Sequence, residues 1–116
     1  TKTPQQDDAW AAASWLKANT PPGAVVMSTG PEVAFHAGRR WLPAPVASRA
    51  EVVEYGLKRG ATHLCLRGRY LRVRPDQKRE LYDGAGDFDD LELLVKSGEK
   101  PPEPSFVVYR LKAPAK

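Results

Sequence analysis

Apolar residues occur along this chain in short blocks whose spacing alternates between two patterns. In the first block Ala9, Ala12, Ala13 and Leu16 share one face of a helix, because residues three or four apart lie on the same side. Two prolines and a glycine then end the helix and lead into an apolar run at 24–28 that does not alternate. A run of this kind is typical of a strand that is buried on both faces.

Helix start and stop patterns delimit the other elements. Ser48 and Glu51 have the spacing of a capping box, and Gly38 is expected to end the helix that Pro31 opens as its first residue. The expected helices are 4–19, 30–38, 48–60, with Val53 and Leu57 on its packed face, and about 75–82. The expected strands are 24–28, 39–45, 62–68, 91–98 and 105–112.

The order of these elements predicts the fold class. Helices and strands alternate through residue 68, which favours a parallel α/β sheet with right-handed crossovers. The last two strands are joined by the Pro-rich segment 99–104 and must pair antiparallel. We expect one soluble α/β domain over residues 1–116: a three-layer, Rossmann-like sheet with a parallel core in the order 2-1-3 and a C-terminal antiparallel hairpin at one edge.

Composition narrows the class of protein. Hydrophobic residues make up 41% of the chain, which is enough for a core and excludes a disordered tail. No apolar run approaches the roughly 18–20 residues that span a bilayer, and no signal peptide is recognisable. Because the first residue is Thr1 rather than Met, we interpret the chain as a domain excised from a longer protein. The net charge of +4 permits an anionic partner without requiring one.

Few residues of the types used in catalysis or metal binding are present. Cys65 stands alone among apolar neighbours and is expected to be buried and unreactive. No cysteine and histidine cluster has metal-site spacing, so we predict no metal and no cofactor. His36 and His63 are each expected to be structural. We assign no catalytic residue, because no nucleophile and base form a local pattern.

A ligand in a doubly wound sheet binds at the carboxyl ends of the strands. Ser28 and Thr29 follow the first strand, and Arg67, Arg69 and Tyr70 follow the third, which makes these five residues the candidate ligand site. The two hydroxyl groups would lie where an anion binds a helix N-terminus. The alternative is that they only cap the helix that follows.

A basic run continues from this site. Its residues are Arg67, Arg69, Arg72, Arg74, Lys78 and Arg79. Such a run suits a membrane surface or a lipid phosphate. The alternative is a solvated face balanced by the acidic residues that follow, Asp83, Asp87, Asp89, Asp90 and Glu92. Nucleic acid is not an expected partner, because the charge excess is small and few aromatic residues interleave the basic ones.

Three tryptophans admit two interpretations. Trp10 and Trp15 flank an alanine-rich helical face, which favours packing in the core or at a domain interface. Trp41 precedes a Pro-rich turn and is the aromatic residue we single out as a candidate carbohydrate contact. Arg39 and Arg40 precede the second strand and face either a partner or solvent.

Three stretches of the sequence resemble one known domain family. They are WLKANTPPGAVVMSTGPEVAFHAGRRWLPAP, EVVEYGLKRGATHLCL and FVVYRL. In order and spacing they resemble the soluble extracytoplasmic C-terminal domain of polytopic bacterial GT-C-type glycosyltransferases. That class is related to the dolichyl-phosphate-mannose–protein mannosyltransferases and the lipid A aminoarabinose transferases. The resemblance covers roughly residues 9–68 and 104–111, and the segment 69–84 matches nothing in it.

The resemblance implies a parent enzyme that transfers a sugar from a polyprenyl-phosphate donor on the periplasmic face of the membrane. The family's catalytic acidic residues lie in the membrane part, so none is carried over to this chain. The implied partners are the transmembrane part of the parent chain and its polyprenyl-phosphate sugar or lipid headgroups. The first hypothesis is therefore a non-catalytic accessory domain, and the alternative is a free-standing flavodoxin-like module that binds a small phosphorylated ligand.

Overall fold

The structure is a computed structural model that describes residues 4–68, 72–98 and 104–113, with side chains from residue 8 onward. Its helices are α1 (Pro4–Asn19), α2 (Glu32–Ala37), α3 (Arg49–Lys58) and α5 (Pro75–Gln77), which continues as the π-helix η1 (Lys78–Asp83). Its strands are β1 (Val25–Ser28), β2 (Arg40–Pro43), β3 (His63–Arg67), β4 (Leu91–Ser97) and β5 (Phe106–Leu111). None of the helices in the described part is both long and apolar enough to cross a membrane.

The strands form one mixed sheet in the order β2-β1-β3-β5-β4. Strand β1 pairs in parallel with β2 and β3, which is the parallel core expected from the alternation of helices and strands. Strand β5 runs antiparallel to both β3 and β4. The α/β class and a sheet with both parallel and antiparallel strands are confirmed, whereas the Rossmann-like order is matched only in part.

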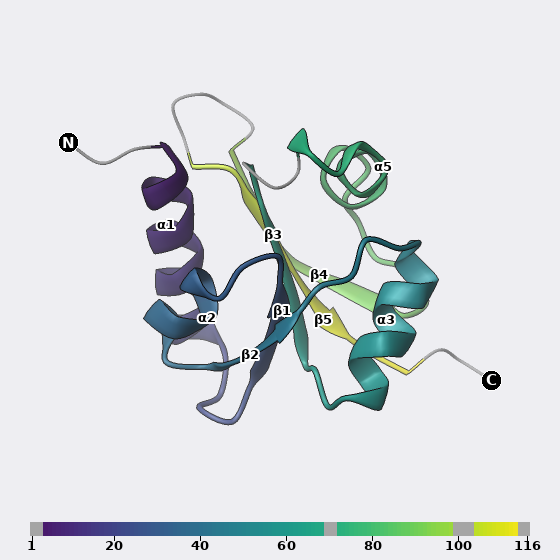
Figure 1. Ribbon diagram of the computed structural model, residues 1–116, viewed down its shortest axis with the longest axis horizontal. Coiled ribbons are helices and arrows are strands. Elements are labelled where there is room, and N and C mark those ends of the chain that lie inside the picture. Colours follow the sequence, from purple (N-terminus) through teal and green to yellow (C-terminus); the bar gives the residue numbers. More distant parts are fainter. Residues whose placement is uncertain (1–3, 69–71, 99–103, 114–116) are drawn as a thin grey trace.

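Helices cover both faces of the sheet. Figure 1 shows α1 and α2 on one face and α3 and α5 on the other, and we call these the α1/α2 side and the α3/α5 side. On the α1/α2 side the buried cluster holds Ala9, Ala12, Ala13, Leu16, Val26, Val33, Ala34, Ala37, Cys65, Phe106 and Val108. On the α3/α5 side the buried cluster includes Met27, Val52, Val53, Leu64, Leu66, Leu81, Leu91, Val107, Tyr109 and Leu111.

Strand β3 places apolar side chains on one side of the sheet and ionisable side chains on the other. All five of its residues are buried. Leu64 and Leu66 belong to the α3/α5 cluster and Cys65 to the α1/α2 cluster. Since side chains alternate along a strand, His63 and Arg67 lie on the same side as Cys65. The α1/α2 side therefore buries three ionisable side chains that come from one strand.

The residues of α3 that pack against the sheet differ in part from those that the hydrophobic pattern predicted. The capping box of Ser48 and Glu51 is present, as predicted. Leu57 was expected on the packed face but is partly exposed, and Val52 and Gly56 are buried instead. A Cβ atom on Gly56 would lie 2.8 Å from side-chain carbons of Met27 and Leu111. The glycine thus lets the helix backbone approach the sheet.

The helix expected at about 75–82 is confirmed in position but differs in type. Only Pro75–Gln77 is α-helical, and the six residues that follow form a π-helix. The amide of Gly84 donates to the carbonyl of Arg79 at 3.0 Å, five residues back. The hydroxyl of Tyr109 donates to the carbonyl of Leu81 at 2.6 Å. Tyr109 of β5, which is buried, therefore binds a carbonyl of the π-helix, and local sequence does not reveal this contact.

The ends of other elements agree with the sequence or shift by a residue or two. Gly38 ends α2 with φ of 69°, a conformation that glycine adopts without strain. Pro31 is the cap of α2 and not its first helical residue, which corrects the expectation. The final strands lie within the predicted ranges. The Pro-rich connection at 99–103 lies outside the described residues.

Candidate functional site

The carboxyl ends of β1 and β3 meet at one edge of the sheet, where the sequence places its candidate ligand site. Ser28 ends β1 and is buried. Its hydroxyl donates to the carbonyl of Gly30 at 2.6 Å, and no side chain caps α2. The capping interpretation of Ser28 and Thr29 is therefore wrong: Ser28 stabilises the turn between β1 and α2, and Thr29 is half-buried beside it.

Arg67 ends β3 at the same edge and points into the molecule. Its side chain is only 6% exposed, and its Nη2 lies 3.3 Å from Oε2 of Glu32 at the start of α2. Glu32 is packed so closely that a Cβ atom on Gly30 would lie 2.5 Å from its Oε2. The pair ties α2 to β3, and an anion could reach Arg67 only in competition with this carboxylate.

Asp8 from α1 completes this edge. The residue is buried, and its Oδ1 accepts a hydrogen bond from the backbone amide of Ser105 at 2.7 Å. A Cβ atom on Gly68 would lie 3.0 Å from Asp8 Oδ2, so the chain after β3 also packs against this carboxylate. Asp8 and Ser105 are 97 residues apart, and no local pattern could have paired them.

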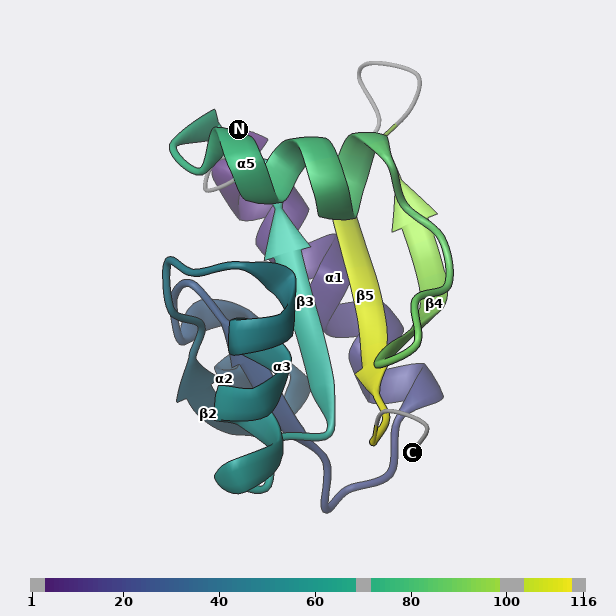
Figure 2. The same ribbon diagram turned by 90° about the vertical axis from the view of Figure 1, so that its right-hand side faces the viewer.

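A pocket of about 480 Å³ lies beyond the ends of β2 and β3 on the α3/α5 side. It is lined by Val46, Ala47, Ser48, Val73, Arg74, Pro75, Asp76, Gln77 and Glu80. Figure 2 shows α5, which forms one wall, crossing the end of β3. Val46 is 78% exposed and Val73 is 72% exposed, so its rim offers apolar surface to a partner. Its size is within the range of small-molecule sites, roughly 300–1,000 Å³.

The guanidinium of Arg74 connects the loop after β2 with Gln77 at the wall of this pocket. Its Nη1 donates to the carbonyl oxygens of Ala44 at 3.0 Å and Pro45 at 3.3 Å, and to Oε1 of Gln77 at 3.3 Å. Gln77 in turn donates to the carbonyls of Pro45 and Ala47. Burial lowers the pKa of Arg74. Both side chains hold the loop after β2 in place.

The rest of the basic run is dispersed. Lys78 pairs with Asp83 at 3.0 Å and Arg79 with Asp76 at 2.9 Å, which are exposed pairs within the same segment. Arg72 is exposed. Arg69 and Tyr70 lie outside the described residues. Among the described residues of the run, Arg67, Arg74, Lys78 and Arg79 therefore lie next to carboxylates or carbonyls of the chain itself, and only Lys78 pairs with one of the acidic residues that follow the run.

The tryptophans divide between packing and exposure. Trp15 packs partly buried against the α1/α2 cluster, as expected. Trp10 does not: it is exposed, and its ring stacks on His36 with centroids 4.1 Å apart. Trp10 lies beside the alanine face and therefore reaches over α2 rather than into the core. Trp41 is partly exposed, and its Nε1 donates to the carbonyl of Ser28 at 3.2 Å.

Arg39 and the buried residues of β3 are structural in this arrangement. Arg39 donates to the carbonyls of Lys17 at 3.2 Å and Thr20 at 2.8 Å, which ties the end of α1 to the end of α2. Burial lowers the pKa of His63, and the charges of Arg110 and Arg39 lower it further. Burial raises the pKa of Cys65 to about 12, with a weaker opposing effect of Arg67. Such a thiol is unreactive, in agreement with the sequence.

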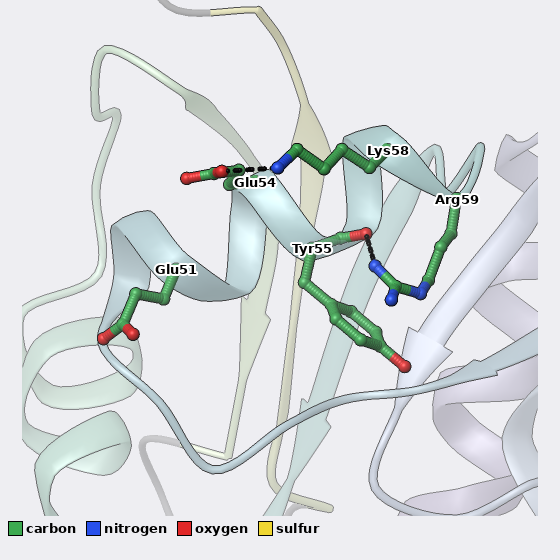
Figure 3. Close-up of a pocket in the computed structure, with 5 residues that line it drawn as sticks. All are labelled: Glu51, Glu54, Tyr55, Lys58 and Arg59. Carbon is green, nitrogen blue, oxygen red and sulfur yellow. Dashed lines mark hydrogen bonds and ion pairs between the residues drawn. The ribbon is translucent and has the colours of Figure 1, made fainter.

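A second depression of about 260 Å³ lies on the outer surface of α3 (Figure 3). Its five lining residues all come from the helix or its end, so no other element supplies an opposite wall. Lys58 pairs with Glu54 at 2.8 Å, which lowers the pKa of that carboxyl. The guanidinium of Arg59 lies 3.8 Å from the ring centre of Tyr55. These groups are bound to one another, and we do not assign a ligand here.

The geometry thus joins some candidate residues and separates others. Ser28 and Arg67 lie at one edge, with Trp41 bound to the carbonyl of Ser28, whereas Arg74, Lys78 and Arg79 belong to the opposite side of the sheet. Every buried side-chain nitrogen or oxygen among the residues that the structure describes has a hydrogen-bond partner. No protein-family model matches the sequence, and no curated protein matches it.

Proposed function

We propose that this chain is a non-catalytic, extracytoplasmic accessory domain of a membrane glycosyltransferase. The parent enzyme transfers a sugar from a polyprenyl-phosphate donor, and the domain docks on the transmembrane part and helps to position the acceptor. The three sequence stretches that resemble such domains support this proposal. On this proposal the domain lies at the periplasmic face of the inner membrane, close to lipid headgroups and to the donor.

One observation carries the accessory role. At the carboxyl edge, the guanidinium groups that a substrate phosphate would need are engaged within the chain: Arg67 by Glu32, and Arg74 by two carbonyls and Gln77. Apolar side chains at the same edge, Val46 and Val73, are exposed instead. A surface of this kind suits contact with another protein segment better than phosphate chemistry.

The same observation ranks the accessory role above a phosphate-binding module. A flavodoxin-like module needs donors that are free to bind the anion at the ends of β1 and β3. Here the hydroxyl of Ser28 donates to a backbone carbonyl, and Arg67 is paired with a carboxylate. A phosphorylated ligand would have to displace Glu32, which makes weak binding the expectation for that alternative.

Two experiments test the proposal. The first reads the coding sequence upstream of the codon for Thr1: several apolar segments of about 20 residues are expected, and a start codon directly before Thr1 contradicts the proposal. The second compares membranes that carry the full-length parent with the isolated chain, using a radiolabelled polyprenyl-phosphate sugar. Transfer is expected only with the parent. Sugar transfer by the isolated chain would show that the domain is itself catalytic.

A further inference from the structure

Four aromatic side chains lie at the surface of the α1/α2 side. Phe35 is 78% exposed, Trp10 45% and Trp41 40%, and His36 is exposed between the first two. His36 stacks on Trp10 at 4.1 Å and meets Phe35 edge-on at 5.6 Å. We call Trp10, Phe35, His36 and Trp41 the aromatic patch.

The register of the sheet places Trp41 on the same side of the molecule as the other three. Trp41 pairs with Val26, whose side chain lies in the α1/α2 cluster, whereas its neighbour Leu42 packs on the α3/α5 cluster. Paired residues of adjacent strands point to the same face, so Trp41 points to the α1/α2 side. The patch therefore spans α1, α2 and the edge strand β2 on one side of the molecule (Figure 1).

Few charged residues lie on the two helices that carry Trp10, Phe35 and His36. Between residues 8 and 38 the charged side chains are Asp8, Lys17 and Glu32. Asp8 is buried, and Glu32 pairs with Arg67. Lys17 is exposed and lies two turns after Trp10 on the same face of α1. In this stretch the described surface thus presents aromatic rings and a cation, with its one exposed carboxylate neutralised.

We infer that the aromatic patch docks on the surface of an anionic lipid bilayer. Tryptophan and phenylalanine enter the interface between headgroups and acyl chains, where an apolar ring is buried and an indole N–H stays hydrated. A cation beside them is attracted to anionic headgroups. A sugar ligand fits less well, because the rings of Trp10, Phe35 and His36 project from the outer surfaces of two helices, and neither of the pockets described above is lined by them.

The α3/α5 side shows why the opposite orientation is disfavoured. Its surface carries Glu51, Glu54, Asp76 and Glu80, which an anionic bilayer would repel, and Arg49, Lys58 and Arg79 pair with three of these carboxylates. Arg74, Lys78 and Arg79, from the basic run that the sequence suggested as a lipid-facing surface, belong to this side. The inference thus moves the lipid contact to the opposite side of the sheet.

Co-sedimentation with lipid vesicles tests this docking. The chain is mixed with vesicles of phosphatidylcholine alone or with about a third phosphatidylglycerol, at low salt. We expect binding to the anionic vesicles with a blue shift of tryptophan emission. Phe35→Ser should weaken the partition coefficient about tenfold, and Leu57→Ser on α3 should leave it unchanged. Circular dichroism confirms that each variant is folded.

A charge-matched pair of variants separates local from net electrostatics. Lys17→Glu and Lys58→Glu change the net charge equally, but only Lys17 lies on the helix face that carries Trp10. We expect Lys17→Glu to weaken binding about fivefold and Lys58→Glu to have little effect.

Three outcomes overturn the inference. They are no binding to anionic vesicles, equal losses with both members of either pair, and a dimer in sedimentation velocity that Phe35→Ser dissociates. The inference does not depend on the glycosyltransferase proposal, since vesicle binding is measured without donor or parent enzyme.

Discussion

The two sides of the sheet differ in where their charged residues lie and in what the surface presents to solvent. On the α3/α5 side, charged residues pair with one another: Arg49 with Glu80 and with the buried Asp90, and Lys58 with Glu54 at the surface. On the α1/α2 side, ionisable residues of β3 are buried, the helices present exposed aromatic rings, and an exposed pair of Arg110 with Glu92 lies on the strands beside them. A surface that satisfies its own charges needs no partner, whereas an exposed aromatic surface loses water when it is covered.

The interiors differ as well. Five of the eleven buried residues in the α1/α2 cluster are alanines of α1 and α2, and small side chains let these helices lie close to the sheet and to each other. The α3/α5 cluster uses larger side chains and a hydrogen bond from Tyr109 to the π-helix. We expect the first side to depend on a few large side chains and the second to depend on buried polar contacts.

The largest expected effect is on the alanine-rich side. Leu16 is the fully buried large side chain of α1, and Leu16→Ala leaves a cavity that neighbouring alanines cannot fill. We expect the free energy of unfolding to fall by about 2–5 kcal/mol. Urea denaturation followed by circular dichroism measures it. The matched control is Val46→Ala, at an exposed position, where a change within about 0.5 kcal/mol is expected. Equal losses in the two variants would contradict the comparison.

The next effect is on the other side. Tyr109→Phe removes the hydroxyl that binds the carbonyl of Leu81 and leaves this buried acceptor unpaired. We expect a loss of about 1–3 kcal/mol in the free energy of unfolding. Tyr55→Phe on the outer surface of α3 is the control, with a change within about 0.5 kcal/mol. A Tyr109→Phe variant as stable as wild type would show that the π-helix does not need this bond.

A smaller effect on stability distinguishes the N-terminus of α3, which follows β2, from that of α2, which precedes it. The side chain of Ser48 caps α3, whereas no side chain caps α2. Ser48→Ala should therefore cost about 1 kcal/mol of stability, and Thr29→Ala before α2 should change it by less than about 0.5 kcal/mol. Thermal unfolding of both variants measures the difference. A larger loss for Thr29→Ala would mean that its hydroxyl stabilises the start of α2 after all.

Local signals account for the elements that the sequence predicts well. The capping box at Ser48, the glycine at 38 and the apolar run of β1 act within a few residues of themselves, and each appears in the structure where expected. The parallel core follows from the order of these elements. The sequence did not predict that the helix after Arg74 continues as a π-helix. The carbonyl of Leu81 in this segment accepts a hydrogen bond from Tyr109 on a distant strand, and local sequence does not reveal such a contact.

The candidate site was harder to predict than the fold, because its contacts join distant parts of the chain. Arg67 was expected to face a ligand, but Glu32, 35 residues away in sequence, lies against it. Arg74 similarly reaches the carbonyls of residues 44 and 45. The exposed position of Trp10 depends on where α2 lies. A basic or aromatic residue in a sequence identifies possible chemistry, while the fold decides whether its partner is internal.

The smallest expected effect is a pH dependence that arises on the α1/α2 side. Burial and the nearby charges of Arg110 and Arg39 lower the pKa of His63 below its ordinary value of 6.5, and its Nδ1 lies 2.7 Å from Oγ1 of Thr62. In the unfolded chain the histidine takes up a proton as the pH falls through 6.5, while the folded protein keeps it neutral until lower pH. The unfolded state then binds more protons, so stability falls as the pH decreases from about 8 to about 5.5. His63→Gln should reduce this slope without removing the contributions of carboxylates at lower pH. Urea denaturation of both proteins across this range measures it, and identical slopes would show that His63 is as free to accept a proton in the folded chain as in the unfolded one.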